Sequence, residues 1–380
     1  MLRKVFYYLA HWEVWHWFAK YIFIGPAWIW FCVKSKSPWF FTPSNPGITF
    51  GGFLGETKRE SYKLLPPGSY PKSAFVSPRL PFDGVKDQVI LKGFKFPFVV
   101  KPDVGMMGLM FRKIESFDQL KQYHAVMESD YIVQELVDYP LEVSVFYYRF
   151  PGRARGRITG FVKKECMSVT GDGKSTLKEL ILAYPRARFR TKELFGKHEN
   201  RLNEVVEDGE RFILSDALNL SRGGRLVNLD YAKDERLLAI FDNLSHHTNF
   251  LYGRYDIKCA SVEDLRQGKN YTILEYNGCG GEPHHVYSGF SFFQACRILI
   301  DHWKILFEIS LQNRANGIRP WSFASGAVFL REARAYFRKL KKLDHSFSFK
   351  KETQKGISRA AIPALPAVNI RGNQLQQRVA

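Results

Sequence analysis

Two stretches late in the chain place charged and amide side chains two residues apart. Arg254 and Asp256 are spaced in this way within GRYDIKC, and Glu275 and Asn277 within ILEYNGCGG. Residues two apart in a strand point to the same face, so antiparallel pairing of the two stretches would gather all four side chains. Carboxylate and amide oxygens are ligands that Mg²⁺ prefers, and the ion often keeps phosphate and water in its shell. The pattern predicts a metal site formed by Asp256, Glu275 and Asn277.

Glycines follow the predicted metal ligands directly, in the sequence NGCGGEP. Because glycine has no side chain, it lets the backbone approach a ligand closely. We therefore expect Gly280 and Gly281 to border the substrate.

A lysine and a glycine-rich turn follow a short apolar strand in the sequence FVVKPDVGMMGLM. Lys101, at the end of the strand, could hold phosphate oxygens, and backbone N–H groups around Gly105 and Gly108 could cover the same phosphates. The turn is not a Walker loop, because no G-K-[ST] sequence leads into a helix here. The alternative interpretation is an ordinary β-hairpin with a glycine turn.

Two further loops carry basic side chains. Lys174 lies in TGDGKST, just ahead of an amphipathic helix whose N-terminus would attract phosphate. Arg222 lies in the small-residue loop NLSRGGR and is a candidate contact to the substrate.

A short apolar link joins two strands in the middle of the chain. Glu135, Leu136 and Val137 form this link, which could present backbone groups to an adenine ring. Glu142, at the start of the next strand, could accept hydrogen bonds from ribose hydroxyls. An ordinary strand–turn–strand connection is the alternative.

The composition sets broad limits on the class of protein. With 380 residues, of which 45% are hydrophobic, the chain can form two domains or one large domain with a full core. The net charge of +19 indicates an anionic ligand, an anionic membrane face or nucleic acid. Nucleic acid is disfavoured, because none of the usual binding signatures is present. The five scattered cysteines indicate a reducing compartment, and the two His doublets are interpreted as surface or loop features.

The two ends of the chain differ from the middle. Residues 1–45 are rich in Trp, Phe and Tyr, but the longest uncharged stretch is too short to span a membrane. This segment could lie in the headgroup layer of a membrane or pack on the protein itself, and both readings stay open. Residues 331–344 predict a basic amphipathic helix, and residues 345–380 a mostly disordered tail.

The order of these motifs resembles the ATP-grasp superfamily, and within it the D-alanine–D-alanine ligase-like and cyanophycin-synthetase-like carboxylate–amine ligases. The resemblance covers about residues 50–310. It implies the α+β class and an ATP-grasp fold, in which two α+β subdomains clasp ATP. The ATP-grasp domain would span residues 85–330, after a reduced region at 46–84 and a short atypical N-terminal region.

The resemblance also implies roles for the catalytic and phosphate-binding residues. Lys101 would bind the α- and β-phosphates, Lys174 the γ-phosphate, and the loop with Gly105 and Gly108 would cover them. Arg254 would stabilise the tetrahedral intermediate.

Further implied roles concern the nucleotide, the metal and the amino-acid substrate. Residues 135–137 would form the adenine hinge, and Glu142 would bind the ribose. Glu56, in the sequence GGFLGE, would hold the amino-acid substrate. The implied cofactors are ATP and two Mg²⁺ ions, for which Mn²⁺ could substitute.

The implied function is that of an ATP-dependent, ADP-forming ligase that joins a small-molecule carboxylate to an amine through an acyl phosphate. D-alanyl-D-alanine is not the expected product, because the loop after Asn277 differs from that of the family. We expect a cytoplasmic protein, at the inner face of the membrane if the aromatic segment binds lipid. A phosphotransferase on the same fold and a non-catalytic ATP-binding, membrane-associated protein are the alternatives.

Overall fold

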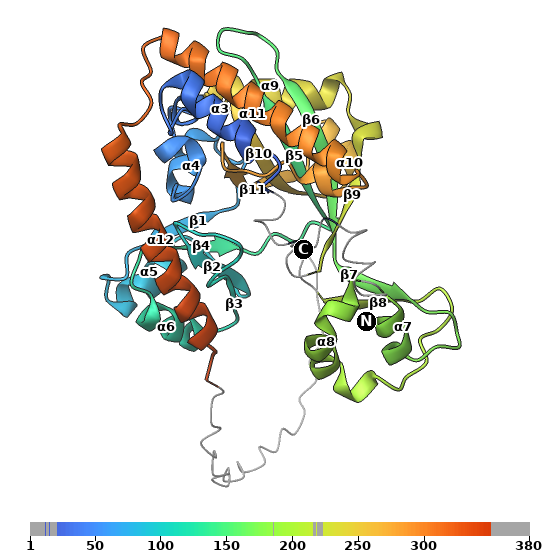
Figure 1. Cartoon of the computed structure of the whole chain (residues 1–380). Helices are drawn as coiled ribbons and strands as arrows, with labels where there is room; N and C mark the ends of the chain where they lie inside the picture. The colour runs from blue at the N-terminus through green and yellow to red at the C-terminus, as the bar shows by residue number, and fades with distance from the viewer. Residues whose placement is uncertain are drawn as a thin grey trace, which may run out of the picture. The chain divides into compact units, whose positions relative to one another are not determined.

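The structure is a computed structural model that describes residues 12, 15, 21–184, 186–215, 218 and 223–350 (Figure 1). The chain divides into two compact units, Met1–Phe347 and Ser348–Ala380, and the first contains all the elements below. Its described residues form three antiparallel sheets with helices packed against them. The predicted α+β class is confirmed.

The first sheet has four strands in the order β1-β4-β2-β3. Lys101 lies near the end of the central strand β2, whose other residues are mostly buried. Helices α5 and α6 contact the edge strands β1 and β3. The bounds are β1 Ser73–Val76, β2 Phe98–Pro102, β3 Arg112–Ile114, β4 Tyr131–Glu135, α5 Phe82–Leu91 and α6 Phe117–Val126.

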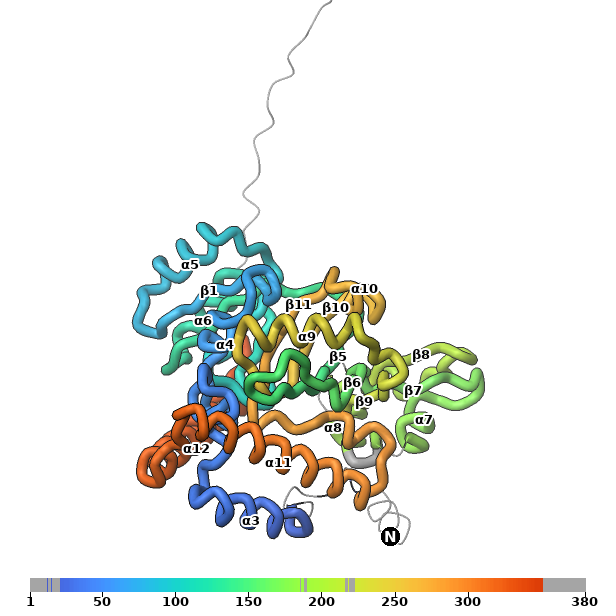
Figure 2. The backbone as a smooth tube through the Cα atoms, turned by 90° about the horizontal axis from the view of Figure 1, so that it is seen from above, coloured from blue at the N-terminus to red at the C-terminus, as the bar shows by residue number. Residues whose placement is uncertain are grey.

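The second sheet has five strands in the order β11-β10-β5-β6-β9. Successive residues of β5 point to opposite faces of the sheet, as the two-residue period of a strand requires. Val143 and Val145 pack with Phe241 of α9, whereas Phe146 packs with Leu306 of α11. The two helices lie on opposite faces of the sheet (Figure 2). The bounds are β5 Leu141–Tyr148, β6 Arg157–Glu165, β9 Arg225–Asn228, β10 Tyr252–Cys259, β11 Tyr271–Asn277, α9 Glu235–Thr248 and α11 Phe292–Ala315.

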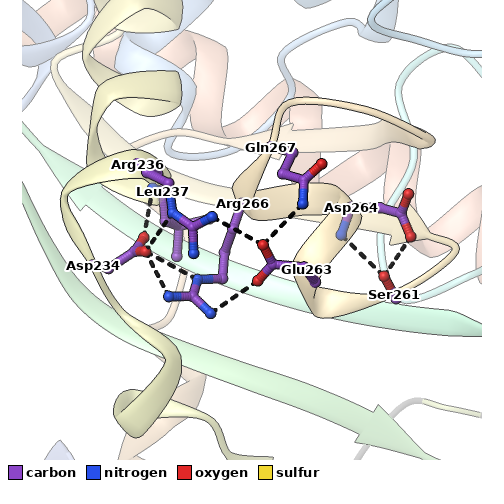
Figure 3. A network of polar contacts seen from close by, with 8 residues as sticks. All are labelled: Asp234, Arg236, Leu237, Ser261, Glu263, Asp264, Arg266 and Gln267. Atoms are coloured by element: carbon purple, nitrogen blue, oxygen red, sulfur yellow. Dashed lines mark hydrogen bonds and ion pairs between the residues drawn. The ribbon is translucent and has the colours of Figure 1, made fainter.

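An ionic network fixes the connection between β10 and β11 (Figure 3). This connection contains the short helix α10 (Val262–Arg266). The guanidinium of Arg266 lies 2.5 Å from Asp234, the N-cap of α9, and 3.0 Å from Glu263. Arg236 bridges the same two carboxylates at 2.9 Å each. Exposed ion pairs stabilise little individually, but a network of this kind fixes the position at which β11 begins.

The third sheet pairs β7 with β8 and has a small core of its own. Leu177 and Ile181 of α7, Leu194 of α8 and Leu214 of β8 are buried in it. The bounds are β7 Met167–Thr170, β8 Arg211–Ser215, α7 Leu177–Ala183 and α8 Thr191–Lys197.

The described part of the aromatic N-terminal segment packs on the protein. Phe31, Phe40 and Phe50 are buried together with Leu306 and Ile309 of α11. Packing on the body is therefore the correct reading for these side chains. The elements are α3 Gly25–Ser35, the 3₁₀ turns η2 Thr42–Ser44 and η3 Thr49–Gly52, and α4 Lys58–Leu64.

Asn45 fastens this segment to the five-stranded sheet. Its Oδ1 accepts hydrogen bonds from the backbone N–H groups of Leu251 and Tyr252, at 2.9 and 3.1 Å. Its Nδ2 donates to the carbonyls of Tyr252 and Gly51, at 2.8 and 3.1 Å. One buried amide therefore holds the segment to the start of β10.

The C-terminal helix α12 spans Phe323–Ser346. It begins earlier than the predicted basic helix, because Ser322 caps its N-terminus by accepting from the Ser325 N–H. Residues 351–380, most of the predicted disordered tail, lie outside the described residues. None of the described helices is long and apolar enough to cross a membrane. The remaining described 3₁₀ turns are η4 Ala187–Arg190, η5 Glu199–Arg201, η7 Asp230–Ala232 and η8 His284–Tyr287.

Candidate active site

The strands β10 and β11 pair as an antiparallel hairpin in the register that the sequence pattern requires. Arg254 lies opposite Asn277, and Asp256 lies opposite Glu275. The register shifts just beyond Asp256, where the bulged residue Leu274 has no partner in the ladder. The four polar side chains therefore come from directly paired positions.

Asp256 is the centre of this cluster and is buried. Its two carboxylate oxygens accept hydrogen bonds from Arg254 Nε and Nη2, at 3.1 Å each. Ser144 Oγ donates at 2.5 Å and Asn277 Nδ2 at 3.2 Å. Burial alone would raise the pKa of Asp256, but the charges of Arg254 and Lys164 outweigh it and hold the pKa far below its usual range. Asp256 is therefore an ionised carboxylate.

Lys164 of β6 is a site residue that the sequence reasoning missed. Its Nζ lies 2.9 Å from Glu142 Oε1 and 3.3 Å from Asp256 Oδ1. Burial disfavours its charge, but the two carboxylates raise its pKa above the usual value. The signal available was the pairing of β5 with β6, which sets Lys164 opposite Glu142.

A second pair of lysines lies at the other side of the cluster. Lys58 Nζ, from the first turn of α4, lies 2.9 Å from Glu275 Oε1. Lys101 Nζ donates to the carbonyl of the bulged Leu274 at 3.5 Å. Burial, and then the charge of Lys58, lower the pKa of Lys101 to about 7. Lys58 was also missed, because only the docking of α4 on Asp103 and β11 brings it to the metal-ligand strand.

Asp103 fixes the start of α4 at this place. Its backbone carbonyl accepts from the Lys58 N–H at 3.0 Å, and its side-chain Oδ1 accepts from the Arg59 N–H at 2.9 Å. Gly105 comes two residues later, and a side chain there would lie 3.2 Å from Lys58 Nζ. The glycine loop is thereby held against Lys58. The other predicted loop glycine, Gly108, has a φ of +73°, a conformation that favours glycine.

A small pocket opens beside Glu275. Glu56 lines it, and its Oε2 is buried with no hydrogen-bond partner among the described residues. Burial raises the pKa of Glu56 above its usual value. The predicted substrate acid therefore lies next to a predicted metal ligand. The lining residues are Glu56, Thr57, Lys58, Ser61, Tyr62, Gly105, Glu275, Tyr276 and Asn277.

The glycines after Asn277 meet another segment of the chain. The N–H groups of Cys279 and Gly280 donate to the carbonyls of Gly51 and Gly52, at 3.1 and 3.0 Å. The N–H of Gly281 donates to the carbonyl of Gly278. A side chain at position 280 would lie only 2.0 Å from a backbone oxygen. The close approach that these glycines permit is therefore made by the protein's own backbone.

A histidine closes the cluster from the loop after β11. His284 Nδ1 lies 3.1 Å from Ser144 Oγ. Its neighbour His285 is buried and packs near His302. The expectation that this His doublet is a surface or loop feature is confirmed for its place in the loop after β11, but His285 is buried and does not lie at the surface. Burial, and then the charge of Arg254, lower the pKa of His284 well below its usual value, so it is a neutral imidazole.

The predicted adenine hinge joins the first sheet to the second. Glu135 is the last residue of β4, and its Oε1 accepts from the Lys72 N–H at 2.7 Å. The carbonyl of Val137 accepts from Lys258 Nζ at 2.9 Å. Leu136 between them is 43% exposed. The apolar surface that an adenine ring would need is therefore available at this residue.

Of the remaining predicted residues, Lys174 is not brought into the cluster. Lys174 is exposed on the loop after β7, where Asp172 Oδ1 accepts from the N–H groups of Lys174 and Ser175. Across residues 21–184 and 223–350, no hydrogen bond or ion pair joins the Lys174 side chain to Asp256 or Glu275. Arg222 lies outside the described residues.

The side chains of the hairpin fit a magnesium ion. In the described part of the chain, no group of three or more His, Cys, Asp or Glu residues forms a metal cluster. Mg²⁺ does not need one, since it is usually held by one or two carboxylates together with phosphate and water. Asp256 and Glu275 supply two carboxylates, and Asn277, which donates through its Nδ2, keeps its Oδ1 for a cation.

Comparison with known proteins gave matches among solved structures alone. No family model and no curated protein matches the sequence. A bifunctional glutathione synthetase from Pasteurella multocida matches with a TM-score of 0.41 and 13% identity, over 64% of this chain and 36% of that one. D-alanine–D-alanine ligase from Bacillus anthracis matches with a TM-score of 0.40 and 14% identity, over 69% of each chain. The ATP-grasp ligase PsnB, complexed with its minimal precursor, matches with a TM-score of 0.34 and 14% identity, over 65% of this chain and 60% of that one. These structures are ligases of the superfamily that the sequence motifs resemble, and this chain spans about a third of the glutathione synthetase.

Proposed function

We propose that the protein is an ATP-dependent carboxylate–amine ligase of the ATP-grasp type. The observation that carries this proposal is the β10–β11 hairpin, which aligns Asp256, Glu275 and Asn277 and surrounds them with cations. Two carboxylates close to lysines, one of them buried and the other partly exposed, match what a magnesium nucleotide needs. The ligase matches among solved structures agree with the proposal at the level of the reaction class.

The lysines have a defined part in this proposal. Phosphoryl transfer depends mainly on positioning and on neutralising charge. Without nucleotide, Lys58 and Lys164 neutralise Glu275, Glu142 and Asp256, because unpaired buried carboxylates would be costly. Asp256, Glu275 and Asn277 would hold Mg²⁺, which would supply positive charge to the carboxylates and to the phosphates of the nucleotide. Lys58 and Lys164 could then pair with phosphate oxygens, together with Lys101.

Arg254 is held for a different task. The Nε and Nη2 of Arg254 donate hydrogen bonds to Asp256, and its Nη1 donates to the carbonyl of Glu282 at 2.8 Å. The guanidinium is therefore fixed before any substrate binds. A substrate carboxylate would attack the γ-phosphorus of ATP and displace ADP to give an acyl phosphate. An amine would then attack the acyl carbon, and inorganic phosphate and a proton would leave as the amide forms. Arg254 would stabilise the oxyanion that develops in this second step.

A small-molecule screen tests the proposal. Purified protein is incubated with Mg²⁺–ATP and with pooled carboxylates and amines, and the release of ADP is measured. We expect ADP release to require both an acid and an amine, and the Asp256→Asn variant to be inactive. ADP release with an alcohol acceptor alone would indicate a phosphotransferase. ATP binding without turnover under any pool would indicate a non-catalytic protein.

A further inference from the structure

The helix α3 is apolar on both of its sides. Its sequence is GPAWIWFCVKS, with a single charged residue, Lys34. The inward side packs in the core, where Phe31 is buried and Trp28 contacts Phe40 and Trp303. A helix that is apolar all round is normally buried on all sides, whether in a protein core or in a membrane. We therefore expect another molecule to cover the outward side of α3.

The outward side exposes large apolar side chains. Ile29, Trp30 and Val33 are 64%, 57% and 66% exposed, and they lie at helical spacing on one face. Ile22 and Phe23, just before the helix, are 56% and 62% exposed. We refer to these five residues as the α3 apolar face. Single exposed apolar residues are common, but a face of this kind marks an interaction site.

Neighbouring elements extend this surface. The ring of Phe23 packs edge-on against Phe292 of α11, with centroids 5.2 Å apart. Phe293, the next residue, is 79% exposed. The chain turn before α3 and the start of α11 therefore meet at one aromatic cluster.

The only charged side chains of the segment that carries the α3 apolar face are basic. No Asp or Glu occurs between Glu13 and Glu56. Lys34 and Lys36 are exposed at the end of α3, and Lys34 Nζ lies 4.8 Å from the centre of the Trp30 ring. Aromatic and aliphatic side chains flanked by lysines are typical of segments that lie in the headgroup layer of an anionic membrane.

We infer that the α3 apolar face docks on an anionic phospholipid surface. The helix is too short to span a bilayer and lies in the interface plane, with Trp30 and its neighbours inserted and the two lysines on the headgroup phosphates. A second copy of the chain fits less well. In a twofold contact, the same face meets itself, and this segment offers no Asp or Glu that could pair with Lys34 and Lys36 of the other copy. This inference does not depend on the proposed ligase activity.

Vesicle binding by the full-length protein tests the inference. Co-sedimentation is measured with vesicles of phosphatidylcholine alone and of phosphatidylcholine mixed with phosphatidylglycerol, at low and high salt. We expect binding to the mixed vesicles alone, and weaker binding at high salt because the lysine contribution is screened. Replacing Lys34 and Lys36 by alanine should weaken binding roughly 30-fold, at about 1 kcal/mol for each lysine near an anionic surface.

Matched variants keep the test specific. Trp30→Ser should reduce binding at least about tenfold through the loss of apolar burial. Leu91→Ser, at an apolar residue of α5 that is more exposed than Trp30 (86% against 57%), should not change it. Both variants should keep the melting temperature of the wild type, because both residues are exposed.

Three results would overturn the inference. The first is no binding of the wild type to anionic vesicles at low salt. The second is binding that survives the α3 variants but is lost when Lys341 and Lys342, on the basic C-terminal helix, are changed to glutamate. The third is a dimer in solution that Trp30→Ser dissociates, which would make a second copy the occupant.

Discussion

Replacing Lys101 with methionine is expected to stabilise the fold while it removes nucleotide binding. Burial and the charge of Lys58 lower the pKa of Lys101 from its ordinary 10.5 to about 7. A tenfold change in acidity corresponds to about 1.4 kcal/mol. Keeping Lys101 in the folded protein therefore costs about 5 kcal/mol at pH 6, where the side chain is charged in both the folded and the unfolded state.

The sign and the pH window of this effect follow from proton binding. Between about pH 7 and 10.5, the unfolded chain holds a proton on Lys101 that the folded chain has lost. The free energy of unfolding therefore rises with pH across this window. The cost falls to about 2 kcal/mol at pH 9. Methionine has a similar length and no charge, so the advantage of Lys101→Met should shrink over the same window.

Chemical denaturation of the wild type and the variant at pH 6 and pH 9 measures both effects. Lys58→Met is the matched control, because the loss of Lys58 leaves Glu275 without its ion-pair partner. Glu275 has a side chain that is 37% exposed, so we expect the control to lose only about 1–3 kcal/mol. The reasoning fails if Lys101→Met is less stable than the wild type, or if its advantage is the same at both pH values. In a thermal-shift titration, ATP should stabilise the wild type and not Lys101→Met.

Three further predictions concern other parts of the site. Arg254→Ala should lower turnover about 10²-fold or more while it spares Mg²⁺–ATP affinity. Asp256→Asn should lower both turnover and Mg²⁺–ATP affinity. An equal loss of nucleotide affinity in the two variants would make Arg254 a phosphate ligand. Glu142→Ala should weaken ATP binding, measured by calorimetry, and the wild type should prefer ATP to GTP; equal thermal stabilisation by the two nucleotides would contradict the hinge assignment. Gly280→Ala should lower the free energy of unfolding by at least about 1–3 kcal/mol in denaturant unfolding, because the new side chain would lie 2.0 Å from the Phe53 carbonyl oxygen. An unchanged unfolding midpoint would show that the loop at Gly280 and the loop at Phe53 separate easily.

The hairpin of the site could be predicted from the sequence because its signal is local. Arg254 and Asp256, like Glu275 and Asn277, follow the two-residue period of a strand, and the two strands are neighbours in the chain. The pairing fixes which side chains meet once both strands are recognised. The α+β class was predictable for a different reason, since it followed from the resemblance of the motif order to the ATP-grasp superfamily.

Two cations of the site, Lys58 and Lys164, could not be predicted because they depend on distant contacts. Lys58 reaches Glu275 only after α4 has docked on Asp103, and Lys164 reaches Asp256 only across the strand β5. Neither lysine has a local pattern that distinguishes it from an exposed surface lysine. Gly280 and Gly281 form a recognisable glycine-rich pattern, which predicts that some other group comes close to the backbone there. The pattern does not tell which group that is. That group proved to be the backbone near Gly52.

The anchoring of the N-terminal segment by Asn45 has a consequence for how the chain folds during synthesis. Asn45 and its partner Tyr252 are 207 residues apart. A ribosome adds roughly 5–20 residues per second, so β10 emerges roughly 10–40 s after Asn45. Throughout that interval, Phe40, Phe41 and Phe50 lack the cover of α11, which follows β10 in the chain. The nascent chain should therefore depend on a chaperone or a nearby lipid surface during this interval, and the N-terminal segment should be the last part of the protein to become resistant to proteases.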